Sequence, residues 1–136
     1  MQQVLVLCTG NSCRSIMAEA MINQLGKGQY EAVSAGSCPA GQVHPKSIAT
    51  LRRHGIGMGQ ARSKSWDEFT NRCFDLVITV CDRAAAETCP VFPGAPRKLH
   101  WSIPDPAEAL GPDDQVDHAF DEVLQILRAR IEKELL

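Results

Sequence analysis

The fold of this 136-residue chain is decided by residues 4–15, which read VLVLCTGNSCRS. Val4 to Leu7 form a short apolar run, which is typical of a strand buried on both faces of a parallel sheet. Small and polar residues follow. From Ser15 to about Leu25 the apolar residues have the spacing of a helix that ends at the following glycines. A strand, a tight loop and a helix in this order indicate an α/β unit.

The rest of the chain repeats this alternation. We predict further strands at 30–34, 76–80 and 97–101, and helices at 45–55, at 67–72 and over a long amphipathic terminal segment. The terminal segment carries apolar residues every three or four positions, at Val116, Phe120, Val123, Leu124, Leu127, Ile131 and Leu135. The predicted fold class is therefore α/β with a doubly wound parallel sheet, in a single domain that spans residues 1–136.

Composition excludes several classes of protein. The chain is 44% hydrophobic and has a formal net charge of −2, so we expect neither a nucleic-acid partner nor a membrane partner. The N-terminus has no basic region, and its apolar run is too short for a signal peptide or a membrane span. We therefore expect a cytoplasmic protein. We also expect a monomer, although the sequence itself does not determine the oligomeric state. In a reducing compartment, its six cysteines suit catalysis or metal binding better than structural disulfides.

The loop after the first strand has the residues of an anion-binding site. Gly10 and Asn11 tolerate left-handed backbone angles, so the N–H groups of the loop can turn inward. The helix that follows adds a positive N-terminal dipole. Arg14 can bind two oxygens of a tetrahedral oxyanion, and the positive surroundings would lower the pKa of Cys8, whose thiolate Ser15 could hydrogen-bond. The expected oxyanion ligands are Thr9, Gly10, Asn11, Ser12, Cys13 and Arg14.

A cysteine and an arginine separated by five residues also occur by chance beside a helix N-terminus. The place of this pair in the predicted sheet favours a functional site, because ligands of doubly wound sheets bind beyond the carboxyl ends of the strands. That edge should gather Cys8, residues 34–37, Cys81 and the segment after Trp101.

Two further cysteines could work with Cys8. The first and third strands should be neighbours, about 4.8 Å apart, and a disulfide needs Cα atoms roughly 4.4–6.8 Å apart. Cys8 and Cys81 could therefore form a disulfide, and Cys89 could reach Cys81 if residues 83–88 rearrange. The alternative interpretation is that Cys81 and Cys89 are small, buried hydrophobic residues.

These motifs resemble those of the low-molecular-weight tyrosine phosphatases and of the arsenate reductases built on their fold. The resemblance covers Val4 to Ser15, Ser34 to Gly36, Val77 to Pro90 and Asp105-Pro106. It implies a four-stranded parallel sheet flanked by helices, with Cys8 as the nucleophile and Arg14 as an oxyanion ligand. It also implies that Asp105 is the general acid, although a proline–aspartate turn by itself is usually only a turn.

Two features favour the reductase over the phosphatase. A tyrosine phosphatase needs aromatic or apolar walls for a phenyl ring. Its relatives carry an aromatic residue after Asp-Pro, where this chain has Ala107, and no aromatic residue occurs between Tyr30 and Trp66. The segment from Val80 to Pro90 resembles the redox segment of thioredoxin-coupled arsenate reductases.

The resemblance implies that the chain reduces arsenate to arsenite, in arsenic detoxification, by a relay of Cys8, Cys81 and Cys89. Phosphate or sulfate would bind as analogues of arsenate. We expect no tightly bound cofactor, with electrons supplied by thioredoxin or by glutathione and glutaredoxin. A phosphomonoesterase or tyrosine phosphatase is the alternative enzyme, and an oxyanion or redox sensor is the alternative without turnover.

We expect no metal centre, because the cysteine spacings are not those of zinc fingers and Arg14 would repel a cation. Some members of the resembling families bind potassium beneath the anion loop, and Asn11, Glu19 and Ser34 match positions used there. The resemblance therefore allows a weak potassium site. The remaining oxygen ligands would fall at residues 62–65, where this chain has no aspartate.

Overall fold

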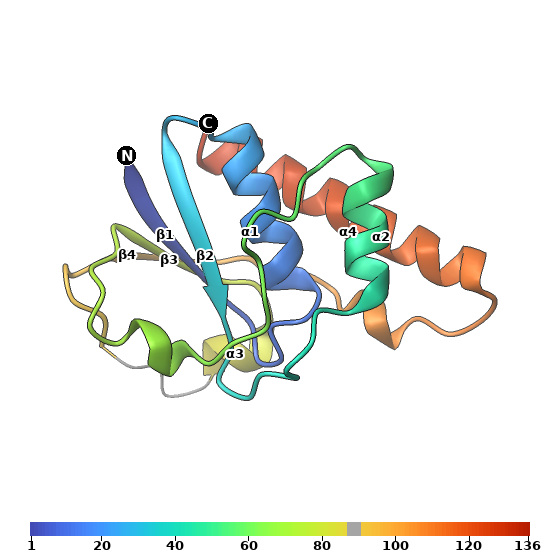
Figure 1. Cartoon of the computed structure of the whole chain (residues 1–136), viewed down its shortest axis with the longest axis horizontal. Coiled ribbons are helices and arrows are strands. Elements are labelled where there is room, and N and C mark those ends of the chain that lie inside the picture. Colours follow the sequence, from blue (N-terminus) through green and yellow to red (C-terminus); the bar gives the residue numbers. More distant parts are fainter. Residues whose placement is uncertain (87–90) are drawn as a thin grey trace.

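The structure, a computed structural model, describes residues 1–86 and 91–136, so that Cys89 lies outside the described residues. Within this part of the chain the sheet has four parallel strands in the order β2-β1-β3-β4 (Figure 1). Their bounds are Gln2–Leu7 (β1), Tyr30–Ala35 (β2), Leu76–Thr79 (β3) and Arg97–His100 (β4). The predicted fold class is confirmed. The chain builds the sheet outward from β1 to β2 on one side and then from β3 to β4 on the other. The strand order therefore reverses between β1 and β3, which are neighbours.

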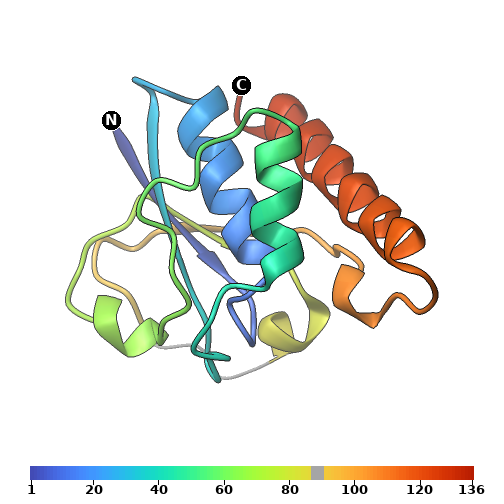
Figure 2. The same cartoon turned by 45° about the vertical axis from the view of Figure 1, so that its right-hand side comes forward.

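Three long helices lie together on one side of the sheet, as Figures 1 and 2 show: α1 (Arg14–Leu25), α2 (Pro45–Arg53) and α4 (Asp113–Glu134). The short helix α3 (Asp82–Ala86) follows β3. Two 3₁₀ turns, η1 (Trp66–Phe69) and η2 (Pro106–Glu108), precede β3 and follow β4. No helix in the described ranges is both long and apolar enough to cross a membrane.

The core has two parts, one on each face of the sheet. Val4 and Val6 belong to the larger cluster, which the long helices complete, while Leu5 and Leu7 belong to the smaller one with Phe69, Phe74 and Phe92. All four strand residues are almost fully buried. Successive side chains of a strand point to opposite faces, so a run without polar residues is what a strand covered on both sides requires.

Several predicted boundaries differ from the structure. The terminal helix begins at Asp113, three residues before the first periodic apolar residue, because Pro112 starts it and two aspartates occupy its first turn. The segment predicted as a helix at 67–72 forms only the 3₁₀ turn η1, and α3 was not predicted. Val80 and Trp101 lie just beyond their strands but continue the ladder, since their N–H groups donate to Leu7 and Thr79.

The carboxyl ends of the strands meet at one end of the molecule, the lower end in Figure 1, opposite the two chain termini. The anion loop (residues 8–13) follows β1 at this end, and α3 follows β3 there.

Gly36 follows β2 directly and packs against the anion loop. Its N–H donates to Lys64 O and its carbonyl accepts from the Trp66 N–H. Its neighbours leave no room for a side chain.

We expect Gly36→Ala to lower the free energy of unfolding by about 1–3 kcal/mol, because a Cβ would lie 2.4 Å from Thr9 O and 2.6 Å from Cys8 O. Gly57→Ala is the matched control, since a Cβ there meets nothing within 4 Å. Urea unfolding of both variants measures the difference. Equal stabilities would show that the loop moves aside freely and is not held by this contact.

Candidate active site

The anion loop is held open by hydrogen bonds from outside it. The N–H groups of Cys38, Ala40 and His44 donate to the carbonyls of Thr9, Gly10 and Ser12 at 2.9–3.0 Å. The C=O and the next N–H of a planar peptide point in opposite directions. Turning these carbonyls outward therefore turns the N–H groups of the following residues inward. The loop forms the inward-facing N–H nest that the sequence predicts.

Helix α1 begins directly after the loop, as predicted. Among the described residues no side chain caps its N-terminus, and no acidic residue occupies its first turn. The first N–H groups of a helix need partners and carry its positive dipole end. This end of α1 is therefore suited to an anion.

Asn11 is the centre of a buried group of hydrogen bonds beneath the loop. It is fully buried and has a φ of +46°. Its Nδ2 donates to Ser15 Oγ at 2.8 Å and to Ser34 Oγ at 2.9 Å, and its Oδ1 accepts from the Lys64 N–H at 2.9 Å. These contacts hold a left-handed conformation that an asparagine tolerates better than most residues.

Ser15 is buried and receives a hydrogen bond from Asn11. Because its oxygen accepts that bond, its own proton is free to be directed elsewhere. Ser15 can thus still donate to the Cys8 thiolate, and this hydrogen bond stays a prediction.

Arg14 and Asp105 meet at the entrance of the loop. Arg14 Nη1 donates to Ile103 O at 3.0 Å, and Nη2 lies 3.7 Å from Asp105 Oδ2. Asp105 Oδ1 accepts from the Ala107 N–H, which fixes the carboxylate at the start of η2. The predicted aspartate does face the loop, although it follows the edge strand β4, which β3 separates from β1.

The thiols of Cys8 and Cys81 are hydrogen-bonded to each other, as the neighbouring positions of β1 and β3 predict. Both residues are almost completely buried. Cys81 Sγ also accepts from the Ala84 N–H at 3.3 Å and lies 3.8 Å from Thr9 Oγ1. The chain has thus brought two sulfurs together at the floor of the site.

Of these two thiols, Cys81 carries the negative charge. The hydrogen bond from Cys8, helped by the Thr9 and Ala84 groups, lowers the pKa of Cys81 to about 5. The same hydrogen bond, followed by burial, raises the pKa of Cys8, against the opposing effects of Arg14 and the Gly10 N–H. The prediction of a lowered pKa for Cys8 is therefore wrong, because a nearby second thiol takes the charge instead.

The cavity over the loop is small and opens into a wider mouth. The inner part has a volume of about 90 Å³ and is lined by the loop together with Asp105 and Ala107. The mouth has about 670 Å³, and its lining includes Cys81, Asp82, Arg83 and Glu108. No aromatic ring lines either part within residues 1–86 and 91–136. The inner space is about three times the ~30 Å³ share of a water molecule, which suits a small inorganic anion.

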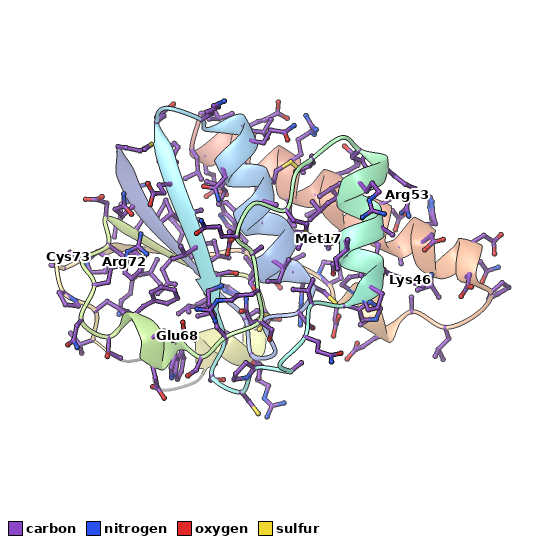
Figure 3. All side chains as sticks on the ribbon, in the orientation of Figure 1. Met17, Lys46, Arg53, Glu68, Arg72 and Cys73 are labelled. Atoms are coloured by element: carbon purple, nitrogen blue, oxygen red, sulfur yellow. The ribbon has the colours of Figure 1, made fainter. Side chains whose placement is uncertain are left out.

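The other cysteines have separate places. Cys13 is buried at the start of α1, where burial raises its pKa against hydrogen bonds from Ser47 and Ser12. Cys38 and Cys73 are exposed free thiols, and Cys73 lies at the edge of the molecule away from α2 (Figure 3). The predicted role of Cys89 falls on a residue outside the described ranges.

The residues do not fit the potassium ion that the resemblance allows. Glu19 and Ser34 do lie together, since Ser34 Oγ donates to Glu19 Oε1 at 2.7 Å. However, the ammonium of Lys64 lies 3.8 Å from the same carboxylate oxygen. A second cation there would be repelled. Sequence reasoning missed Lys64, although a lysine in the segment where a ligand was expected is a signal that could have identified it.

We expect alkylation of Cys81 by iodoacetamide to have an apparent pKa of about 5. A thiol with a lowered pKa is a thiolate above that pH, so the rate should level off well below the ordinary thiol value of about 8.5. Cys8→Ala removes the largest stabilising contact and should move the profile upward. Mass spectrometry of the Cys81 peptide in a Cys38→Ser, Cys73→Ser background reads this site alone. A wild-type rate that rises until about pH 8.5 would contradict the assignment.

Comparison with known proteins agrees with this site. The model of the low molecular weight phosphotyrosine protein phosphatase family matches residues 3–135. An arsenate reductase of Halalkalibacterium halodurans is 35% identical over 125 residues, which cover 92% of this chain and 88% of that protein.

Two solved structures are similar throughout the chain. One is an arsenate reductase in the phosphate-binding state, with a TM-score of 0.78, 29% identity and coverage of 98% of this chain and 95% of that one. The other is a thioredoxin-dependent arsenate reductase of Corynebacterium glutamicum, with a TM-score of 0.71, 27% identity and coverage of 98% and 61%. The chain belongs to the low molecular weight phosphotyrosine protein phosphatase family and, within it, to the arsenate reductases.

Proposed function

We propose that this protein reduces arsenate to arsenite with a relay of three cysteines, Cys8, Cys81 and Cys89. The observation that carries the proposal is the hydrogen-bonded pair of buried thiols, Cys8 and Cys81, at the floor of an oxyanion loop. A phosphatase needs one nucleophilic sulfur there. A two-electron reduction needs two.

The first step is the binding of arsenate and attack by Cys8. Arg14 and the inward N–H groups of residues 9–13 neutralise the oxyanion. The proton shared by the two thiols passes to Cys81, and the thiolate of Cys8 attacks arsenic. Asp105 donates a proton to the departing oxygen, which leaves as water and creates a Cys8–arsenic bond.

The second step transfers two electrons to arsenic. Cys81 loses its proton to the Asp105 carboxylate that the first step left ionised and then attacks Cys8 Sγ, and a Cys8–Cys81 disulfide forms as the sulfur–arsenic bond breaks. The electron pair of that bond stays on arsenic, which leaves as arsenite. The hydrogen bonds from Thr9 and Ala84, which stabilise a thiolate on Cys81, prepare it for this attack.

Regeneration of the enzyme moves the disulfide from the Cys8–Cys81 pair to the Cys81–Cys89 pair. Cys89 attacks Cys81, which frees Cys8 and leaves a Cys81–Cys89 disulfide for an external dithiol donor. The thioredoxin-dependent relative from Corynebacterium glutamicum supports a thiol donor, and we propose thioredoxin, with glutathione and glutaredoxin as the alternative. Such a relay works in a reducing compartment, and we propose a cytoplasmic monomer.

Hydrolysis of phosphate esters is the second candidate, because the family model describes tyrosine phosphatases and the nucleophile, arginine and aspartate are the ones that hydrolysis uses. The small inner cavity with Ala107 on its wall is less suited to a phenyl ring than to a free oxyanion. Disulfide formation without turnover, as in a sensor, is the third.

We expect arsenate-dependent NADPH oxidation by the purified protein with thioredoxin and its reductase, and loss of that activity in Cys8→Ser, Cys81→Ser and Cys89→Ser. Cys38→Ser and Cys73→Ser should remain active, because both residues are exposed and remain outside the relay. Glutathione, glutaredoxin and its reductase, assayed in parallel, identify the donor. If neither system supports consumption and aryl phosphate hydrolysis survives the loss of Cys81 and Cys89, the protein is a phosphatase.

We expect Asp105→Asn to lower kcat on the order of 10²-fold, because an amide cannot supply the proton to the leaving oxygen. Glu108→Gln, which removes a neighbouring carboxylate of the same mouth, is the matched control. Steady-state rates with saturating donor, together with the affinity for sulfate, separate catalysis from binding. An Asp105→Asn rate equal to that of wild type would remove Asp105 from the mechanism.

A further inference from the structure

We propose that the buried ammonium of Lys64 acts as an internal counter-ion that holds the anion loop in its binding form. Lys64 thereby takes the place of a bound monovalent cation. It is a positioning residue, since it acts through Glu19, Ser34 and Asn11 and lies beneath the loop. Binding of an oxyanion tests this role even if the protein does not reduce arsenate.

Lys64 is buried to an extent that is rare for a lysine. Its side chain is 5% exposed, as is that of Glu19, and the two charged groups lie 3.8 Å apart. Lys64 Nζ also donates to Arg62 O at 2.8 Å. Lysine and glutamate are almost never fully buried unless paired. Removing one partner of such a pair leaves an uncompensated buried charge.

The pair is connected to the loop by hydrogen bonds whose directions can be assigned. The Glu19 carboxylate can only accept, so Ser34 must donate to it. Ser34 oxygen is then the acceptor for Asn11 Nδ2. This places the Asn11 amide oxygen on the opposite side, where it accepts from the Lys64 N–H.

Lys64 therefore closes a ring. Its ammonium balances Glu19 at one end of the chain of hydrogen bonds, and its backbone fixes Asn11 at the other. Asn11 has the left-handed conformation within the loop. The charge on Lys64 thus reaches the oxyanion site through the orientation of one amide.

The pKa shifts of Glu19 and Lys64 show that each charge depends on the other. Burial is the largest effect on both groups: it raises the pKa of Glu19 and lowers that of Lys64, and each partner opposes the shift of the other. The nearby charges are Arg62, which weakens the charge on Lys64, and Glu68, which is paired with Arg62.

A cavity of about 380 Å³ is lined by Glu19, Lys64, Asn23 and Arg62 among others. An ion from solvent could reach Glu19 through it if the lysine side chain were shortened. This offers a test that a merely structural role would not satisfy.

The experiment measures sulfate binding by calorimetry in choline, sodium, potassium and ammonium chloride at equal ionic strength. Wild type should bind equally in all four salts. Lys64→Ala should bind at least about tenfold more weakly in choline and recover in potassium or ammonium. Lys64→Met, which fills the same space without a charge, should stay weak in every salt. Lys27→Met, at an exposed lysine, is the matched control and should behave as wild type.

A charge-compensating variant keeps the test valid if a single variant does not fold. Glu19→Gln combined with Lys64→Met removes both charges, while the amide oxygen introduced at position 19 still accepts from Ser34. This double variant should bind sulfate better than Lys64→Met and in a salt-independent way. The proposal would be overturned by potassium dependence of the wild type, by full binding by Lys64→Ala in choline, or by no recovery of Lys64→Ala in any salt. A double variant no better than Lys64→Met would also overturn it.

Discussion

The left-handed backbone of Asn11 is the constraint on which the site depends. A loop of backbone N–H groups can face an anion only if its carbonyls turn the other way, and each outward carbonyl must then have a partner. The segment 38–44 supplies those partners, and the three hydrogen bonds of Asn11 fix the bend between them. These hydrogen bonds lie within the protein, so we expect them to reduce the ordering that anion binding requires.

The two active-site thiols divide the chemistry by sharing a proton. A lone cysteine beside Arg14 would be expected to carry the charge itself. In the hydrogen-bonded pair the charge rests on Cys81, where Thr9 and Ala84 stabilise it, and we propose that the charge moves to Cys8 when a substrate is present. In the relay that we propose, one ionisation therefore serves two successive nucleophiles. This arrangement suits a reaction in which the second attack must follow the first.

The surroundings of the loop favour a small substrate. Ala107 leaves the inner cavity without an aromatic wall, and the mouth is lined largely by polar and charged groups, among them Asp82, Arg83 and Glu108. The family that shares this scaffold is named after its phosphatases. The difference between the two chemistries lies in a few residues at the carboxyl edge of the sheet, while the fold stays constant.

Contiguous residues determined much of this protein. The apolar run at 4–7, the loop with its glycine and asparagine, and the following helix are local signals, because strand, turn and helix preferences act over a few neighbouring positions. They predicted the class of fold and the sheet, the anion loop, and the adjacency of Cys8 and Cys81, which follows from strand order. The start of α4 and the short helix α3 were missed, since caps and single turns carry weaker signals.

Only the tertiary structure decided the charges. Lys64 lies 53 positions from Asn11, and its burial against Glu19 depends on how the segment before η1 crosses beneath the loop. The ionisation of Cys8 was predicted wrongly for the same reason: it depends on the sulfur of Cys81, which β3 brings to it, and not only on its neighbours in the loop. Electrostatic effects act through space and grow as water is excluded, so they are determined by the packed arrangement of distant segments.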